Sequence, residues 1–319
     1  MISVIMPLYN NEKYVIEAIQ SVINQTYEDW ELIIINDAST DNSKFVVQNF
    51  LEKKSDKRII FIDLKENKGV SFARNLGMRK AKGEYISFLD SDDFWDKSFL
   101  DELYKRIKET NCKFCFSQYA YIYNDKDIIN CKTKLNEGNL IEYIYMNKSR
   151  WEMLFPFHIG SILIENKFLK TSQIIFPEDQ TLFEDALFIS KLLCITNAMG
   201  VNKILMYYRQ QDKSAFHKDF LPEEYNQELI FFYRLKRYAE KNNLLNIYIL
   251  ENVIIYRTYR IILSIIKSGY INEGLEYINL YEKNLKEFIK RKYHRINDRI
   301  KCRIFLLKNK KLLNLLKNI

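Results

Sequence analysis

The segment GEYISFLDSDDFW, residues 83 to 95, decides the fold class of this 319-residue chain. Its apolar run, residues 85–89, predicts a buried β-strand. An acidic turn follows, formed by Asp90, Ser91, Asp92 and Asp93. Three carboxylates this close repel each other, and a hard divalent cation, Mg²⁺ or Mn²⁺, would compensate their charge. The alternative is that the turn caps a helix that begins near Lys97.

Strands and helices alternate on either side of this segment. Short apolar runs predict buried strands at 2–6, 31–35 and 59–62, and amphipathic patterns predict helices at 12–25, about 42–54, 70–81 and 97–109. Pro7 and Asn10 are expected to end the first strand. The alternation is typical of βαβ units and indicates an open α/β domain, in which ligands bind beyond the carboxyl ends of the strands.

The pattern changes after residue 110. Strands are expected at 114–123, 158–164 and 204–208, with a helix at 182–195, and only helices follow, at 223–242, 245–267, 271–290 and 296–317. We therefore expect a catalytic domain over 1–218, with halves 1–110 and 111–218, and a helical region over 219–319.

Composition and charge restrict the compartment and the partners. Five cysteines without framework spacing indicate a reducing compartment, and Cys112-x-x-Cys115 falls on a strand pattern rather than on a metal site. The N-terminus lacks a signal-peptide pattern, and the apolar stretch 244–266 is interrupted by charges, which predicts a buried helix. These features predict a cytoplasmic protein.

The net charge of +8 is concentrated in the C-terminal tail. Residues 283–319 carry 13 Lys and Arg against two acidic residues. Apolar residues recur there at near-helical spacing: Ile304, Phe305, Leu312, Leu316 and Ile319. This pattern predicts an interfacial helix attracted to anionic lipid on the inner membrane face. The alternative is a helix packed on its own domain with a solvated basic face. Nucleic acid is not an expected partner, because the remainder of the chain is not basic.

Taken in order, the strand ends resemble the inverting family-2 glycosyltransferases of the GT-A fold. The matching motifs are Pro7-x-Tyr9-Asn10, Asn36-Asp37-Ala38-Ser39-Thr40-Asp41, Asn67-x-Gly69 with Ala73-Arg74-Asn75, FLDSDDFW, and Glu184-Asp185. The resemblance covers residues 1–215 and implies an open mixed sheet flanked by helices. The helical C-terminal extension matches no motif.

The resemblance implies a donor site for a nucleotide-sugar with Mn²⁺ or Mg²⁺ as cofactor. Asp92 would be the metal ligand, Asp90 would share the metal or face the ribose, and Asp93 would either support them or cap the next helix. Asp37 would accept a hydrogen bond from the base, which favours a UDP-sugar. The residues assigned to the donor are Pro7, Tyr9, Asn10, Asp37, Arg74, Asp90, Ser91 and Arg209.

The resemblance also implies the catalytic and acceptor residues. Asp185 would be the general base, and Glu184 would orient the acceptor; the alternative for both is an acidic helix start. Trp95 would form the floor of the acceptor-sugar site, or else belong to the core. His217 would complete the metal site, or else lie on the surface.

The expected function is transfer of a sugar from a nucleotide donor to a hydroxyl of a glycan or lipid-linked acceptor in a bacterial surface polysaccharide or lipooligosaccharide pathway. Two alternatives remain open at this point. One is a nucleotidyltransferase, although PLYNN (7–11) lacks the glycine and lysine of a phosphate loop. The other is an inactive family member that serves as a membrane-docked partner subunit.

Overall fold

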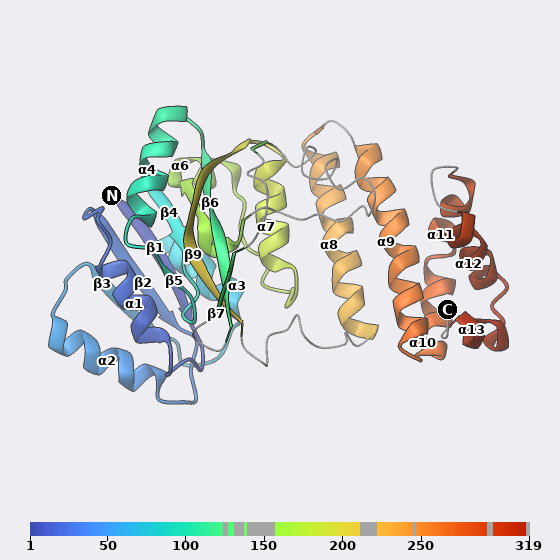
Figure 1. Ribbon diagram of the computed structural model, residues 1–319, viewed down its shortest axis with the longest axis horizontal. Helices are drawn as coiled ribbons and strands as arrows, with labels where there is room; N and C mark the ends of the chain where they lie inside the picture. The colour runs from blue at the N-terminus through green and yellow to red at the C-terminus, as the bar shows by residue number, and fades with distance from the viewer. Residues whose placement is uncertain are drawn as a thin grey trace. The chain divides into compact units, whose positions relative to one another are not determined.

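The structure is a computed structural model that describes residues 1–123, 127–130, 137–138, 157–210, 222–244, 247–291 and 296–316. The chain divides into two compact units (Figure 1). All described residues up to Gln210 belong to the first unit, and those from Pro222 onward belong to the second.

The first unit begins with four parallel strands. They are β1 (Ile2–Leu8), β2 (Trp30–Asn36), β3 (Ile59–Asp63) and β4 (Tyr85–Phe88), in the spatial order β3-β2-β1-β4. β1 and β2 are fully buried, which explains why their sequences are continuous apolar runs. Since the strands are parallel, their carboxyl ends meet at one edge, where the predicted donor motifs follow β1, β2 and β4.

The sheet continues with strands of mixed direction. β8 (Ile162–Glu165) pairs antiparallel with β4, β6 (Phe114–Tyr123) follows antiparallel to β8, and β9 (Ala198–Gln210) is parallel to β6. Two short strands complete the sheet: β5 (Phe94–Trp95) pairs with β9, and β7 (Asp127–Asn130) pairs with β6. This confirms the predicted open mixed sheet.

Helices cover both faces of the sheet. Apolar side chains of α1 (Val15–Ile23), α2 (Ser43–Lys54) and α4 (Phe99–Thr110) share one core with Ile2, Val4, Met6 and Leu8 of β1. The opposite face carries Ile5 and Phe88, which contact α3 (Val70–Lys80) and α7 (Glu184–Leu193), respectively. The remaining short elements are η1 (Ile159–Ser161) and α6 (Asn166–Ser172).

Pro7 does not end the first strand, so the expected boundary is wrong. β1 continues to Leu8, and Pro7 is in register with Ile35 of β2. Pairing with β4 stops at Ile5, whose carbonyl accepts the Leu89 N–H, whereas the Leu8 carbonyl accepts the Asp37 N–H on the β2 side. Backbone groups alternate in direction, so the missing N–H of Pro7 faces the side where β4 has already ended. Proline is tolerated there because no ladder bond is lost.

The second unit is helical. Its helices are α8 (Pro222–Lys241), α9 (Ile247–Lys267), α10 (Ile271–Leu280), α11 (Glu282–Lys290), α12 (Ile296–Leu306) and α13 (Lys310–Leu316). α9 is buried around most of its circumference and contacts α8, α10, α11 and α13. Arg257 of α9 forms an ion pair with Glu228 of α8.

Two of the predicted C-terminal helices are each divided in two. The helix expected at 271–290 breaks at Tyr281, and the helix expected at 296–317 breaks after Leu306, where Lys308 has a positive φ of 53°. The breaks let each piece turn its own apolar face inward. Phe305 and Leu316 are therefore buried in the core of the second unit. For these two residues the alternative of packing on the domain is correct, and Ile319 lies outside the described residues.

The cysteine pair and the long helices agree with the sequence patterns. Cys115 is buried on β6 and Cys112 precedes it, both as free thiols, as expected for a core strand. In the described part of the chain, no helix combines the length and the apolarity that crossing a bilayer requires.

Gly77 tests the packing of α3 against the sheet. A Cβ added at this glycine would lie 2.4 Å from Ile5 Cγ2 and 3.1 Å from Ile35 Cδ1. Overpacking of this kind costs about 1–3 kcal/mol, more than the ~0.5–1 kcal/mol that alanine gains over glycine in a helix. Gly77→Ala should therefore lower the thermal melting temperature. Lys80→Ala, at an exposed position of the same helix, is the control, and an unchanged or raised melting temperature for Gly77→Ala would contradict the packing.

Candidate active site

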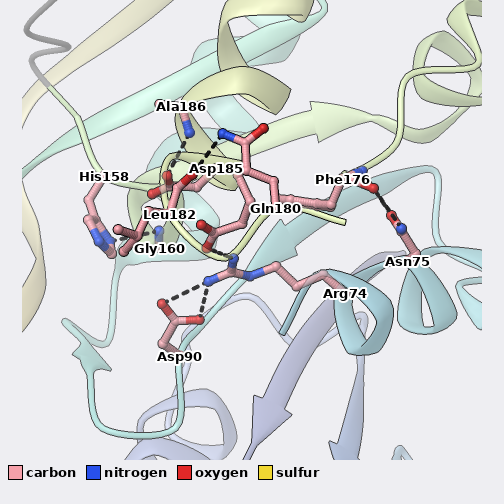
Figure 2. A network of polar contacts seen from close by, with 11 residues as sticks. Arg74, Asn75, Asp90, His158, Gly160, Phe176, Gln180, Leu182, Asp185 and Ala186 are labelled. Carbon is pink, nitrogen blue, oxygen red and sulfur yellow. Dashed lines mark hydrogen bonds and ion pairs between the residues drawn. The ribbon is translucent and has the colours of Figure 1, made fainter. Parts of the chain in front are cut away.

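Arg74 of α3 is a buried cation at the centre of the candidate site. Its Nη2 donates to Asp90 Oδ1 at 2.8 Å and Oδ2 at 3.1 Å, and its Nη1 lies 3.3 Å from Glu184 Oε1 (Figure 2). The guanidinium is 3% exposed. Burial disfavours its charge, but the nearby carboxylates, Asp90 first, outweigh this and raise the pKa of Arg74 further. The predicted donor residue thus joins the acidic turn to the Glu184-Asp185 pair.

The carboxylates of the acidic turn have different surroundings. Burial opposes ionisation of Asp90, but the charge of Arg74 outweighs this and holds the pKa of its carboxyl below the usual range. Asp93 is 1% exposed, and burial together with the charges of Asp92 and Asp90 raises its pKa well above the usual value. Ser91 Oγ accepts from Asn11 Nδ2 at 3.0 Å. The two carboxyls of this turn are therefore shifted in opposite directions: the pKa of Asp90 is lowered and that of Asp93 is raised.

The alternative that this turn caps the next helix is wrong. α4 begins at Phe99, and Asp96 Oδ1 accepts hydrogen bonds from the backbone N–H and the hydroxyl of Ser98. Asp93 Oδ1 instead accepts the backbone N–H of Arg209, and its buried Oδ2 has no hydrogen-bond partner among the residues that the structure describes. Asp93 consequently fastens the turn to β9.

Arg209 holds the acidic turn from the side of β9. Its Nε donates to the backbone carbonyl of Asp92 at 2.9 Å, and its Nη2 forms an ion pair with Glu17 at 2.7 Å. The guanidinium also lies over the ring of Tyr14, 4.2 Å from its centroid. The predicted donor residue thus lies next to Asp92.

The loop after β1 is fastened to the loop after β2. Asn10, at a positive φ of 49°, accepts the Thr40 N–H at 2.7 Å and donates its own N–H to Ser39 Oγ at 3.0 Å. Tyr9 beside it is 49% exposed, so its ring is accessible to a ligand. Asn11 extends the connection through its N–H to Ser43 Oγ.

Asp37 lies buried at the end of β2 and holds a third loop. Its Oδ1 accepts the Lys68 N–H and its Oδ2 accepts the Gly69 N–H, both at 2.8 Å. Asn67 Nδ2 also donates to the Asp37 carbonyl. Each carboxylate oxygen retains a second lone pair, so Asp37 can accept a hydrogen bond from a base and hold this loop at the same time.

The Glu184-Asp185 pair opens α7. Phe183 precedes it in the left-handed region, with φ 64°, which is costly for a residue with a bulky side chain. Asp185 Oδ1 accepts the Ala186 N–H at 2.6 Å. Burial, then repulsion by Asp185, raises the pKa of Glu184 to about 7, despite the nearby charge of Arg74.

His158 belongs to the site, although the sequence analysis assigned it no role. Its Nδ1 accepts the Gly160 N–H at 3.1 Å (Figure 2). Its ring stacks on Tyr208 with 4.5 Å between centroids. Burial lowers its pKa although Asp90 and Asp185 oppose this, so the ring is neutral with its proton on Nε2. Local sequence carried no signal of this position, because it depends on pairing between β8, β4 and β6.

Trp95 lies in the core, so the second of its two predicted roles is correct and it does not form the floor of a sugar site. Its indole N–H donates to the Gly160 carbonyl at 2.7 Å, and its ring stacks on Phe99 with centroids 4.1 Å apart. The side chain is 3% exposed, which leaves no open ring face for a sugar. Of the other predicted residues, Pro7 is buried in β1, and His217 lies outside the described residues.

The family follows from comparison with known sequences. Residues 3–169 match the family described as Glycosyl transferase family 2, which is more than half of the chain. The chain belongs to glycosyl transferase family 2. It is therefore a glycosyltransferase, and the nucleotidyltransferase alternative is set aside.

Two curated relatives illustrate the family. The chain is 31% identical over 214 residues to the putative teichuronic acid biosynthesis glycosyltransferase TuaG of Bacillus subtilis, a match that covers 67% of this chain and 81% of TuaG. It is 38% identical over 125 residues to the UDP-Glc:alpha-D-GlcNAc-diphosphoundecaprenol beta-1,3-glucosyltransferase WfgD of Escherichia coli, covering 39% of this chain and 48% of WfgD. Both relatives are named as glycosyltransferases.

Solved structures share the fold. The S. aureus TarS fragment 1–349 in complex with UDP-GlcNAc has a TM-score of 0.71 at 21% identity, over 99% of this chain and 90% of that one. The mannosyltransferase PcManGT from Pyrobaculum calidifontis, in complex with GDP-Man and Mn²⁺, has a TM-score of 0.57 at 14% identity, over 98% and 86%. The fold of this family-2 enzyme is therefore the GT-A fold, followed by a helical region.

Glu184 gives the site a pH dependence with a definite sign. Between about pH 4.3, the ordinary glutamate pKa, and about 7, the folded protein keeps a proton that the unfolded chain has lost. The contribution of Glu184 to the free energy of unfolding therefore falls as pH rises through this window. Glu184→Gln removes the titration, so its melting temperature should fall less than that of the wild type between pH 5 and 8.

Glu102→Gln is the control for this comparison, because Glu102 forms a surface ion pair with Lys203. Its melting curve should follow the wild type across the pH range. Parallel pH profiles for wild type and Glu184→Gln would show that Glu184 does not titrate in this window.

Proposed function

We propose that the enzyme is an inverting glycosyltransferase that moves a sugar from a UDP-sugar to a hydroxyl of a glycan or lipid-linked acceptor in a bacterial surface-glycan pathway. The observation that carries this proposal is the single network in which Arg74 joins Asp90 of the acidic turn to Glu184, next to Asp185. Donor-side and acceptor-side carboxylates thereby lie around one cation. The names of TuaG and WfgD support the choice of pathway.

The acidic turn fits a cation that is shared with the donor. Asp90 is bound to Arg74 through both oxygens, and Asp93 is buried and accepts the Arg209 N–H, so Asp92 is the carboxylate that we assign to Mn²⁺ or Mg²⁺. Within the described ranges, no group of three or more His, Cys, Asp or Glu residues could hold a metal ion. Mg²⁺ commonly takes one or two protein carboxylates and completes its shell with phosphates and water. A bound cation would neutralise charge on the diphosphate.

Asp185 is the proposed general base. It would accept the proton of the acceptor hydroxyl as that oxygen forms a bond to the anomeric carbon and the bond to the diphosphate breaks, which inverts the anomeric configuration. Glu184 has a pKa of about 7, so it is only partly ionised near neutral pH, and Arg74 holds its carboxyl group. It therefore suits orientation of the acceptor better than proton removal. The intact acidic residues also favour an active enzyme over an inactive partner subunit.

Several residues are proposed to bind the donor. Asp37 would accept the N–H of uracil with the lone pairs that its loop contacts leave, while the exposed ring of Tyr9 lies against the base. Asn10 and Pro7 would shape this pocket, and Ser91 and Arg209 would hold the acidic turn behind the diphosphate. We leave Trp95 out of the acceptor site because it is buried. The enzyme would act as a peripheral protein on the inner face of the cytoplasmic membrane.

Asp185→Asn tests the base. The amide keeps the shape of the side chain but cannot take a proton, so transfer should fall about 100- to 10,000-fold while donor affinity is unchanged. Turnover is measured with a panel of acceptors, and donor affinity by calorimetry. Asp101→Asn on the first turn of α4 is the matched control. Turnover retained by Asp185→Asn would place the base elsewhere.

Asp92→Ala tests the metal assignment. Calorimetric titration with UDP-GlcNAc, the donor bound in a TarS structure, should show binding that Mn²⁺ strengthens in the wild type and not in the variant. Wild-type binding that is the same with and without Mn²⁺, or a variant that keeps the Mn²⁺ dependence, would refute the assignment. Asp101→Asn again serves as the control.

A further inference from the structure

The second unit exposes apolar side chains on a helix whose opposite face is already buried. Within α12 and the turn that follows it, Cys302 and Phe305 point into the core, whereas Ile296 is 71% exposed, Ile300 47% and Leu307 65%. Ile296 and Ile300 are four residues apart and lie on one side of α12, and Leu307 follows directly after the helix ends at Leu306. We call them the α12 stripe. The stripe does not include Phe305 and Leu316, which the sequence pattern placed on an interfacial helix and which are buried in the structure.

The segment that carries the stripe is predominantly basic. Residues 296–316 contain six Lys and Arg, and their one acidic residue is Asp298. The Asp298 carboxylate accepts the Tyr259 hydroxyl at 2.8 Å and is thereby engaged by α9. Arg303 of α12 and Lys310 and Lys311 at the start of α13 are exposed. An apolar stripe in a basic segment is complementary to a bilayer, which has anionic headgroups at its surface and an apolar interior below them.

We propose that the α12 stripe and these basic residues form a surface that binds an anionic lipid bilayer in the plane of its interface. Isoleucine and leucine side chains would enter the headgroup and acyl boundary, while Lys and Arg contact anionic headgroups. Lys308 contributes less, because it already forms an ion pair with Glu282. This binding rests on the second unit and does not require the proposed sugar transfer.

Vesicle flotation of the full-length protein tests the proposal. It should float with vesicles of phosphatidylglycerol and phosphatidylcholine, and remain at the bottom with phosphatidylcholine alone. The triple variant Ile296→Ser, Ile300→Ser, Leu307→Ser should lose flotation without losing its fold, since all three positions are exposed. Phe45→Ser, at an exposed apolar position of α2 (68%), is the matched control and should float normally.

The double variant Lys310→Gln, Lys311→Gln tests the charge separately. At about 1 kcal/mol per basic residue, partitioning should weaken roughly 30-fold, and added salt should weaken wild-type binding as well. Three results would overturn the proposal: no flotation of the wild type, flotation that the triple serine variant retains, or a triple variant whose defect is loss of a dimer in light scattering. The last result would make the stripe a contact between copies of the chain.

Discussion

The buried charge of Arg74 is the constraint on which the site depends. An unpaired guanidinium would be very costly at this depth, so the chain must supply carboxylates. It supplies them from the turn after β4 and from α7, segments far apart in sequence. Removal of either partner would leave charge uncompensated. The same ion pairs therefore connect the turn after β4 to the start of α7 and hold Asp90 and Glu184 around one cation.

The parallel strands bring their polar loops together at one edge of the sheet, and hydrogen bonds connect these loops to one another. Asn10 joins the loops after β1 and β2, and Asp37 joins the loop after β2 to that before α3. Asp93 and Arg209 attach the acidic turn to β9. A donor would consequently meet a surface whose backbone is already ordered, which reduces the entropy lost on binding.

The sequence predicted the parallel half well, because β1 and β2 are continuous apolar runs and each is followed by a recognisable polar turn. It missed β5, which has two residues, and α6, which has seven, since neither carries a periodic pattern. The predicted site residues fall mostly within one region, but their roles stay predictions. His158 and the burial of Asp93 depend on pairing between distant strands, and no local pattern specifies that.

The left-handed backbone of Phe183 has a consequence for how this enzyme can evolve. Glycine or asparagine would occupy that conformation at lower cost, so selection for stability alone would favour replacing the phenylalanine. The same replacement would loosen the start of α7, which carries Glu184 and Asp185. On the role proposed for Asp185, stability and turnover would pull this position in opposite directions, and a search for heat-resistant variants should monitor it first for lost activity.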